Sequence, residues 1–141
     1  MGKIVAIDYG QKRIGLAYAD DMLKVALPFK TVEAGKDMPK TVDLILQALN
    51  PISKEVKLFV VGLPLLMSGQ EGPMAKEAKA FGKLLEQKSG INVQYFDERL
   101  TSAGIERELK HANISRKKRA KKIDPLAATR ILQAFLASQT T

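Results

Sequence analysis

Three acidic residues stand at the ends of predicted secondary-structure elements, and their placement points to metal chemistry. Asp8 ends the first apolar strand, one of the adjacent acids Asp97 and Glu98 ends a later strand, and Asp124 opens the last predicted helix. Because the ends of separate elements can meet at one edge of a sheet, the three carboxylates can form one cluster. Clustered carboxylates repel one another and are usually neutralised by Mg²⁺ or Mn²⁺, which also bind water and substrate phosphate. The sequence therefore predicts a site that holds Mg²⁺ or Mn²⁺ together with substrate phosphate.

Two of these acids also have an ordinary structural explanation. Asp8 precedes a turn that contains Gly10, and an aspartate in that position often accepts a hydrogen bond from the backbone of its own turn. Asp124 stands directly before Pro125, which is a common arrangement at the N-cap of a helix. A capping residue can also bind a cation, so the sequence leaves both roles open.

Asp97 and Glu98 are adjacent, and only one of them can readily face Asp8. Side chains alternate along a strand, so these two carboxylates point to opposite faces. The longer side chain of Glu98 can reach a cation from the end of the strand, whereas Asp97 can pair with Arg99 or cap a following helix. We predict that Glu98 is the ligand, with the exchanged assignment left open by the sequence alone.

Other catalytic arrangements find little support. One histidine and no cysteine cannot form a Ser-His-Asp or cysteine-based triad. That histidine, His111, is expected at the end of a surface helix, where it meets the helix dipole or a phosphate. The glycines of VGLPLLMSGQEG, residues 61–72, lack the Gly-Lys-Ser/Thr of a P-loop and the spacing of a dinucleotide fingerprint. They are expected to form a permissive loop at the active site.

Positive charge is concentrated in the second half of the sequence. The net charge is +8; residues 1–70 carry nine Lys and Arg against seven Asp and Glu, or +2, and residues 71–141 carry fourteen against eight, or +6. The segment SRKKRAKK, residues 115–122, has no acid and six cations, which are Arg116, Lys117, Lys118, Arg119, Lys121 and Lys122. Such a block favours nucleic acid, because each neutralised phosphate releases counterions.

The basic run has two other interpretations. A membrane is the poorer partner, because no apolar face accompanies the charges. A solvated surface loop that only aids solubility stays open. Lys12 and Arg13, in the turn just after Asp8, are further candidates for contacts with the scissile phosphate or its neighbouring backbone.

The apolar patterns predict an α/β fold. Strands are expected at about residues 3–9, 13–19, 24–33, 56–62 and 91–97, and helices over 37–50, 73–90, 101–111 and 124–138. The first three strands are joined by short turns and should be antiparallel, whereas the later strands follow helices and should be parallel. The first strand is apolar on both faces and is expected at the centre of this mixed sheet, with Asp8 at its carboxyl edge.

Length and composition set the broad class. A chain of 141 residues with 45% hydrophobic composition fits one domain over residues 1–141. The sequence has no cysteine, no apolar run of membrane-spanning length and no signal-peptide pattern, so a cytoplasmic location is expected. The sequence does not distinguish a monomer from a homodimer.

Four motifs, in this order and spacing, give the sequence a family resemblance. They are AIDYGQKRIGLAYAD (6–20), VVGLPLLMSGQEG (60–72), DERLTS (97–102) and IDPLAATRILQAFL (123–136). The sequence resembles the YqgF family, whose members are described as Holliday junction resolvases and as nucleases that process precursor small-subunit ribosomal RNA. One departure follows Gly-Leu-Pro, where the family often has a polar residue and this chain has Leu65, Leu66 and Met67.

The resemblance implies a ribonuclease H-like fold with a mixed five-stranded sheet flanked by helices. It also implies that Asp8, Glu98 and Asp124 are metal-binding catalytic acids. Arg99 and Thr101 would support the motif at the end of the fifth strand, and Arg99 joins the candidate nucleic-acid contacts. The function implied is metal-dependent hydrolysis of phosphodiester bonds in structured nucleic acid. The expected substrate is the 5′ end of precursor 16S rRNA, in ribosomal precursor particles, and the alternative is branched DNA.

Two further functions stay open from the sequence. A non-catalytic RNA-binding factor in ribosome assembly would use the basic run but would not need the acidic trio. An ATPase of the actin-like superfamily also has an Asp-x-Gly turn after its first strand, but it normally needs a second phosphate loop and a longer chain. Divalent-dependent cleavage separates the first from a nuclease, and stabilisation by nucleotide would favour the second.

Overall fold

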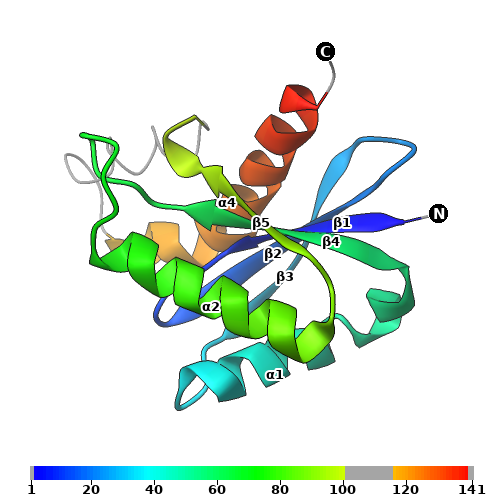
Figure 1. Ribbon diagram of the computed structural model, residues 1–141, viewed down its shortest axis with the longest axis horizontal. Coiled ribbons are helices and arrows are strands. Elements are labelled where there is room, and N and C mark those ends of the chain that lie inside the picture. The colour runs from blue at the N-terminus through cyan, green and yellow to red at the C-terminus, as the bar shows by residue number, and fades with distance from the viewer. Residues whose placement is uncertain (1, 101–115, 140–141) are drawn as a thin grey trace.

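The described part of the chain is a five-stranded sheet with helices on both faces (Figure 1). The computed structural model describes residues 2–100 and 116–139, and only the backbone of residues 116–125. The elements are β1 (Lys3–Asp8), β2 (Arg13–Asp20), β3 (Ala26–Glu33), α1 (Met38–Ala48), the 3₁₀ helix η1 (Asn50–Glu55), β4 (Val56–Leu63), α2 (Pro73–Ser89), β5 (Val93–Asp97), the 3₁₀ turn η2 (Glu98–Leu100) and α4 (Arg116–Ser138).

The strand order is β3-β2-β1-β4-β5, which places β1 at the centre. β1 and β2 are antiparallel, as are β2 and β3, whereas β4 runs parallel to both β1 and β5. Ile7 of β1 lies opposite Leu16 of β2 and Val61 of β4. The predicted α/β class, the mixed sheet and the central position of β1 are confirmed.

Alternating side chains along β1 enter two separate apolar cores. Val5 and Ile7 pack on the side of α1 and α2, in one cluster with Ile45 and Phe81. Ile4 and Ala6 pack on the side of α4, in a second cluster with Ile131. Because residues i and i+2 share a face of a strand, the position of Asp8 belongs to the α4 face.

The helices on the first face have local signals at their ends. α1 begins after Asp37, whose Oδ1 accepts a hydrogen bond from the backbone N of Lys40 at 2.9 Å, as expected of an N-cap. α2 begins at Pro73 and ends before Gly90, which adopts a left-handed conformation with φ of 73°. The helix predicted over 37–50 ends slightly earlier, and its expected stop at Asn50 and Pro51 opens η1.

The last helix is longer than predicted. It begins at Arg116 rather than at Asp124, so the interpretation of Asp124 as an N-cap is wrong. Residues 116–122 are Arg, Lys and Ala, which have high helix propensity, and they extend the helix even though Pro125 lacks a backbone donor. The basic run is therefore helical from residue 116 onward, not a loop. The inward positions predicted for Ile131, Leu132, Phe135 and Leu136 are confirmed.

Two observations limit the remaining expectations. The predicted helix over 101–111, with Thr101 and His111, lies outside the described residues. Neither range of described residues contains a helix with the length and apolar content that crossing a membrane requires.

Candidate active site at the carboxyl edge of the sheet

Three parallel strands end at one edge of the sheet. β1 ends at Asp8, β4 ends at Leu63, and β5 ends at Asp97. The turn 9–12, the loop 64–72 and η2 follow these ends. In open α/β sheets, ligands bind outside the carboxyl ends of the strands, so this edge is the expected position of a site.

Asp8 is buried at this edge, with 5% of its surface exposed. It is the last residue of β1 and lies on the α4 face, above Ile4 and Ala6. Burying a carboxylate is costly unless cations or hydrogen-bond donors compensate it. A buried acid at the exit of an apolar central strand therefore indicates a specific role.

Glu98 is buried as deeply, with 4% of its surface exposed, and its side chain lies against Gly62 of β4. A Cβ atom at Gly62 would lie 2.7 Å from Oε1 of Glu98 and 2.6 Å from Cδ1 of Ile131. Gly62 follows Val60 by two residues, and Val60 belongs to the α4 core. Glu98 therefore lies on the α4 face, and Gly62 provides the space for it between β5 and β1.

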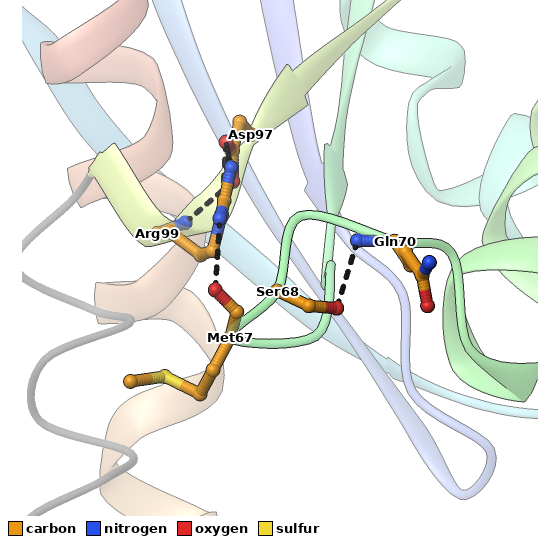
Figure 2. Close-up of polar contacts among 5 residues, drawn as sticks. All are labelled: Met67, Ser68, Gln70, Asp97 and Arg99. Carbon is orange, nitrogen blue, oxygen red and sulfur yellow. Dashed lines mark hydrogen bonds and ion pairs between the residues drawn. The ribbon is translucent and has the colours of Figure 1, made fainter.

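Asp97 has a different role from that of its neighbour. Its two carboxylate oxygens accept hydrogen bonds from Arg99, from Nε at 3.1 Å to each oxygen and from Nη2 to Oδ2 at 2.7 Å (Figure 2). The backbone N of Arg99 also donates to Oδ1 at 2.9 Å. These hydrogen bonds lower the pKa of Asp97 and raise the pKa of Arg99. The prediction that Asp97 pairs with Arg99 is confirmed.

The turn after Asp8 is fastened to α2. Tyr9 Oη donates to Oε1 of Glu77 at 3.1 Å, and Nε2 of Gln11 donates to Oε2 of the same residue at 3.1 Å. The Tyr9 ring stacks on Phe81, with the ring centroids 4.6 Å apart. Burial, followed by the negative charge of Glu77, raises the pKa of Tyr9 to about 12. Sequence reasoning missed Glu77, because no local motif distinguishes it from the other charged residues of α2.

The two basic residues of this turn differ in exposure. Lys12 is exposed, and Arg13, the first residue of β2, is half-buried. A Cβ atom at Gly10 would lie 2.4 Å from the carbonyl oxygen of Arg13, so this tight turn requires glycine. The turn thus keeps both cations near the end of β1.

Comparisons with known proteins fit this arrangement. The sequence profile of the RuvX family, described as Holliday junction resolvase, matches residues 2–138. The chain belongs to the RuvX family. This result confirms the resemblance to YqgF, which is another name of the same family.

Curated RuvX relatives match over nearly their whole length. A protein of Protochlamydia amoebophila is 40% identical over 141 residues, which cover 97% of this chain and 94% of the relative. A protein of Clostridioides difficile is 41% identical over 137 residues, which cover 96% of this chain and 94% of the relative. Both relatives are named as pre-16S rRNA nucleases.

Solved structures with a similar fold include two resolvases. Thermus thermophilus RuvC in complex with a Holliday junction substrate gives a TM-score of 0.55 at 14% identity, covering 100% of this chain and 98% of that one. The fowlpox virus Holliday junction resolvase gives a TM-score of 0.51 at 15% identity, covering 96% of this chain and 98% of that one. The RuvX chain thus has the ribonuclease H-like fold that the sequence predicted.

Two of the three predicted acids are buried at the carboxyl edge of the sheet. Asp8 ends β1, and Glu98 follows β5 with its side chain against Gly62 of β4, the strand between them. The backbone of Asp124 is in α4, but its side chain is outside the described set, as are those of the six cations of residues 116–122. Among the described side chains, no group of three or more His, Cys, Asp or Glu residues is placed to hold a metal ion.

Replacing Gly62 with Ala tests the path of Glu98 across β4 in the RuvX chain. The added methyl would overlap Oε1 of Glu98 and Cδ1 of Ile131, and overpacking of this kind costs about 1–3 kcal/mol. We expect a lower melting temperature and a large loss of cleavage per folded molecule.

Gly82→Ala is the matched control. It crowds the hydroxyl of Tyr95 at 2.6 Å on the α2 face, away from Glu98. It should leave cleavage per folded molecule near that of the wild type. If Gly62→Ala cleaves as fast as Gly82→Ala, the side chain of Glu98 is not needed in its observed position.

Proposed function

We propose that this RuvX chain is a metal-dependent nuclease that hydrolyses phosphodiester bonds in structured nucleic acid. Its proposed substrate is the 5′ end of precursor 16S rRNA. The single observation that carries the proposal is the burial of Asp8 and Glu98 on one face, at the carboxyl edge of the sheet. The names of the curated relatives support the choice of substrate.

The donor set at this edge fits a divalent cation. Asp8 and Glu98 offer carboxylate oxygens, which Mg²⁺ and Mn²⁺ prefer, and both are buried at the same edge of the sheet. Asp124 would be the third ligand. It precedes Ile131 by seven residues, or about two turns of α4, and positions seven apart lie on the same side of a helix. The side chain of Ile131 lies beside the Gly62 position. A pair of such ions, when bound, supplies an activated water for in-line attack and stabilises the leaving oxygen.

The remaining residues would bind and orient the substrate. Lys12 lies at the end of the turn after Asp8 and Arg13 begins β2, so both would place positive charge beside the scissile phosphate. The basic turns of α4, residues 116–122, would hold the flanking backbone through its phosphates. This basic run contains no aromatic residue for base stacking, so recognition would depend on the shape of the nucleic acid.

Resolution of branched DNA is the second candidate function. The description of the RuvX family as Holliday junction resolvase favours it. Both functions use the same hydrolysis at the same carboxylates, and they differ only in the nucleic acid that the surface accepts.

A cleavage assay with two substrates tests both proposals. One substrate is a structured RNA that carries the 5′ precursor of 16S rRNA, and the other is a four-way DNA junction. Each is incubated with Mg²⁺, with Mn²⁺ and with EDTA. We expect cleavage of the RNA with either ion and none with EDTA. Faster cleavage of the junction would favour the resolvase, and binding of RNA without cleavage would favour a non-catalytic assembly factor.

A further inference from the structure

Asp97 and Arg99 connect the end of β5 to the loop between β4 and α2. Nε and Nη2 of Arg99 both donate to the carboxylate of Asp97, and this charge-assisted pair of donors is the fork. Nη1 of Arg99 also donates to the carbonyl oxygen of Met67 at 3.4 Å. Figure 2 shows the guanidinium between the carboxylate of Asp97 and the backbone of Met67. Asp97 is two positions from Arg99 in the sequence, whereas Met67 is 32 positions away. Arg99 therefore joins the end of β5 to a distant part of the chain.

The loop that receives Arg99 has a defined shape of its own. The backbone N of Gly69 donates to the carbonyl of Leu66 at 2.8 Å, and the backbone N of Leu66 donates to the carbonyl of Gln70 at 2.9 Å. Gly69 has a φ of +87°, which favours glycine, and a Cβ there would lie 3.5 Å from Nη1 of Arg99. The guanidinium therefore packs over a closed turn rather than extending freely into solvent.

Glu98 lies between the two members of the fork in the sequence, and its side chain is on the opposite face. The hydrogen bond from the backbone N of Arg99 to Asp97 fixes the start of η2, the turn that contains Glu98. Both carboxylate oxygens of Asp97 are occupied by Arg99, which leaves that carboxylate poorly suited to a cation. The fork thus holds the backbone on both sides of Glu98.

We propose that Asp97 and Arg99 are positioning residues that hold Glu98 and the loop 64–70 as one unit at the carboxyl edge. The proposal rests on the proposed nuclease function and extends it. It also replaces the expectation that Arg99 contacts nucleic acid directly, because three of its five N–H donors serve Asp97 and Met67. The unit places the exposed side chains of Leu66 and Met67 beside the catalytic edge, where a bound substrate would meet them.

Kinetic measurements on Asp97→Asn, Arg99→Gln and the double variant test this role. Each single variant should lower kcat about 10- to 100-fold. Losses of this size are typical when a residue that orients a metal ligand is removed or a catalytic group is misplaced. The double variant should lose no more than the worse single variant, because both act through one unit. Arg99→Lys should recover only part of kcat, since an ammonium group cannot span both the carboxylate and the Met67 carbonyl.

Two further measurements separate positioning from a direct phosphate contact. The slope of log binding constant against log salt should be unchanged in Arg99→Gln, whereas loss of one phosphate contact flattens it by about 0.7–0.9. Hydrogen exchange of the backbone amides of residues 65–70 should be faster in both single variants. Lys88→Gln is the control, because it breaks an exposed ion pair between α2 and Asp43 and should change none of these quantities.

The outcomes distinguish this inference from the proposed function. A flatter salt slope with unchanged kcat would make Arg99 a phosphate contact, and additive losses in the double variant would separate Asp97 from Arg99. Unchanged exchange of the backbone amides of residues 65–70 would also overturn the inference, and this measurement needs no activity. Absence of cleavage by the wild type would instead overturn the proposed nuclease function.

Discussion

Replacement of Asp8 by Asn should abolish cleavage and leave the fold at least as stable. Asn has nearly the shape of Asp, so packing at the end of β1 is preserved, but the negative charge that would hold a cation is lost. The change also removes a buried negative charge, whose desolvation costs free energy on folding. The measurement is the cleavage rate at saturating Mg²⁺ beside the melting temperature.

Asp20→Asn provides a control with the same chemistry at the opposite edge of the sheet. Asp20 also ends a strand, and its carboxylate accepts from the backbone N of Met22 at 2.8 Å. This variant should cleave at the rate of the wild type. If Asp8→Asn cleaves normally, or melts far below the wild type, Asp8 is a structural residue and the proposed active site is wrong.

The framework of the fold was predictable because its signals are local. Branched apolar residues mark the strands, and short turns or intervening helices set their relative directions. The face of Asp8 also follows from simple alternation with Ile4 and Ala6, and the two apolar cores confirm it. Each of these inferences needs only a few neighbouring residues.

The errors arose where two local signals compete. At Asp124 and Pro125 the capping pattern competes with a preceding run of strong helix formers, and α4 continues through it from Arg116. The third strand begins at Ala26 rather than near residue 24, because Lys24 adopts a φ of 54° and its backbone N donates to the carbonyl of Asp20. The sequence contains both possibilities at such places, and tertiary packing selects one.

Contacts between distant segments were beyond the sequence. Two hydrogen bonds depend on how separate segments meet in space. Arg99 donates to the carbonyl oxygen of Met67, and Tyr9, in the turn after Asp8, donates to Glu77. Gly62 did give a signal, since a glycine inside an otherwise branched strand often marks close approach of another group. That signal shows that something approaches, and only the structure shows that it is Glu98.

Glu98→Gln should lower metal-dependent cleavage by orders of magnitude while the melting temperature stays close to that of the wild type. Gln can occupy the same space above Gly62, but its neutral amide is a much weaker ligand for Mg²⁺ or Mn²⁺ than a carboxylate. Calorimetric titration with Mn²⁺ should accordingly show weaker binding, which gives a readout that does not depend on turnover. Glu98→Asp should also fail, because its shorter side chain cannot reach across β4.

Asp97→Asn is the matched comparison, since it removes the neighbouring charge from the opposite side of the same strand end. It weakens the fork with Arg99, and an exposed ion pair of this kind contributes little to folding. We expect a slightly lower melting temperature, a smaller loss of cleavage than in Glu98→Gln, and Mn²⁺ binding near that of the wild type. If Asp97→Asn instead loses Mn²⁺ binding while Glu98→Gln retains it, the two roles must be exchanged, because the face on which a carboxylate is buried would then not determine which one binds the cation.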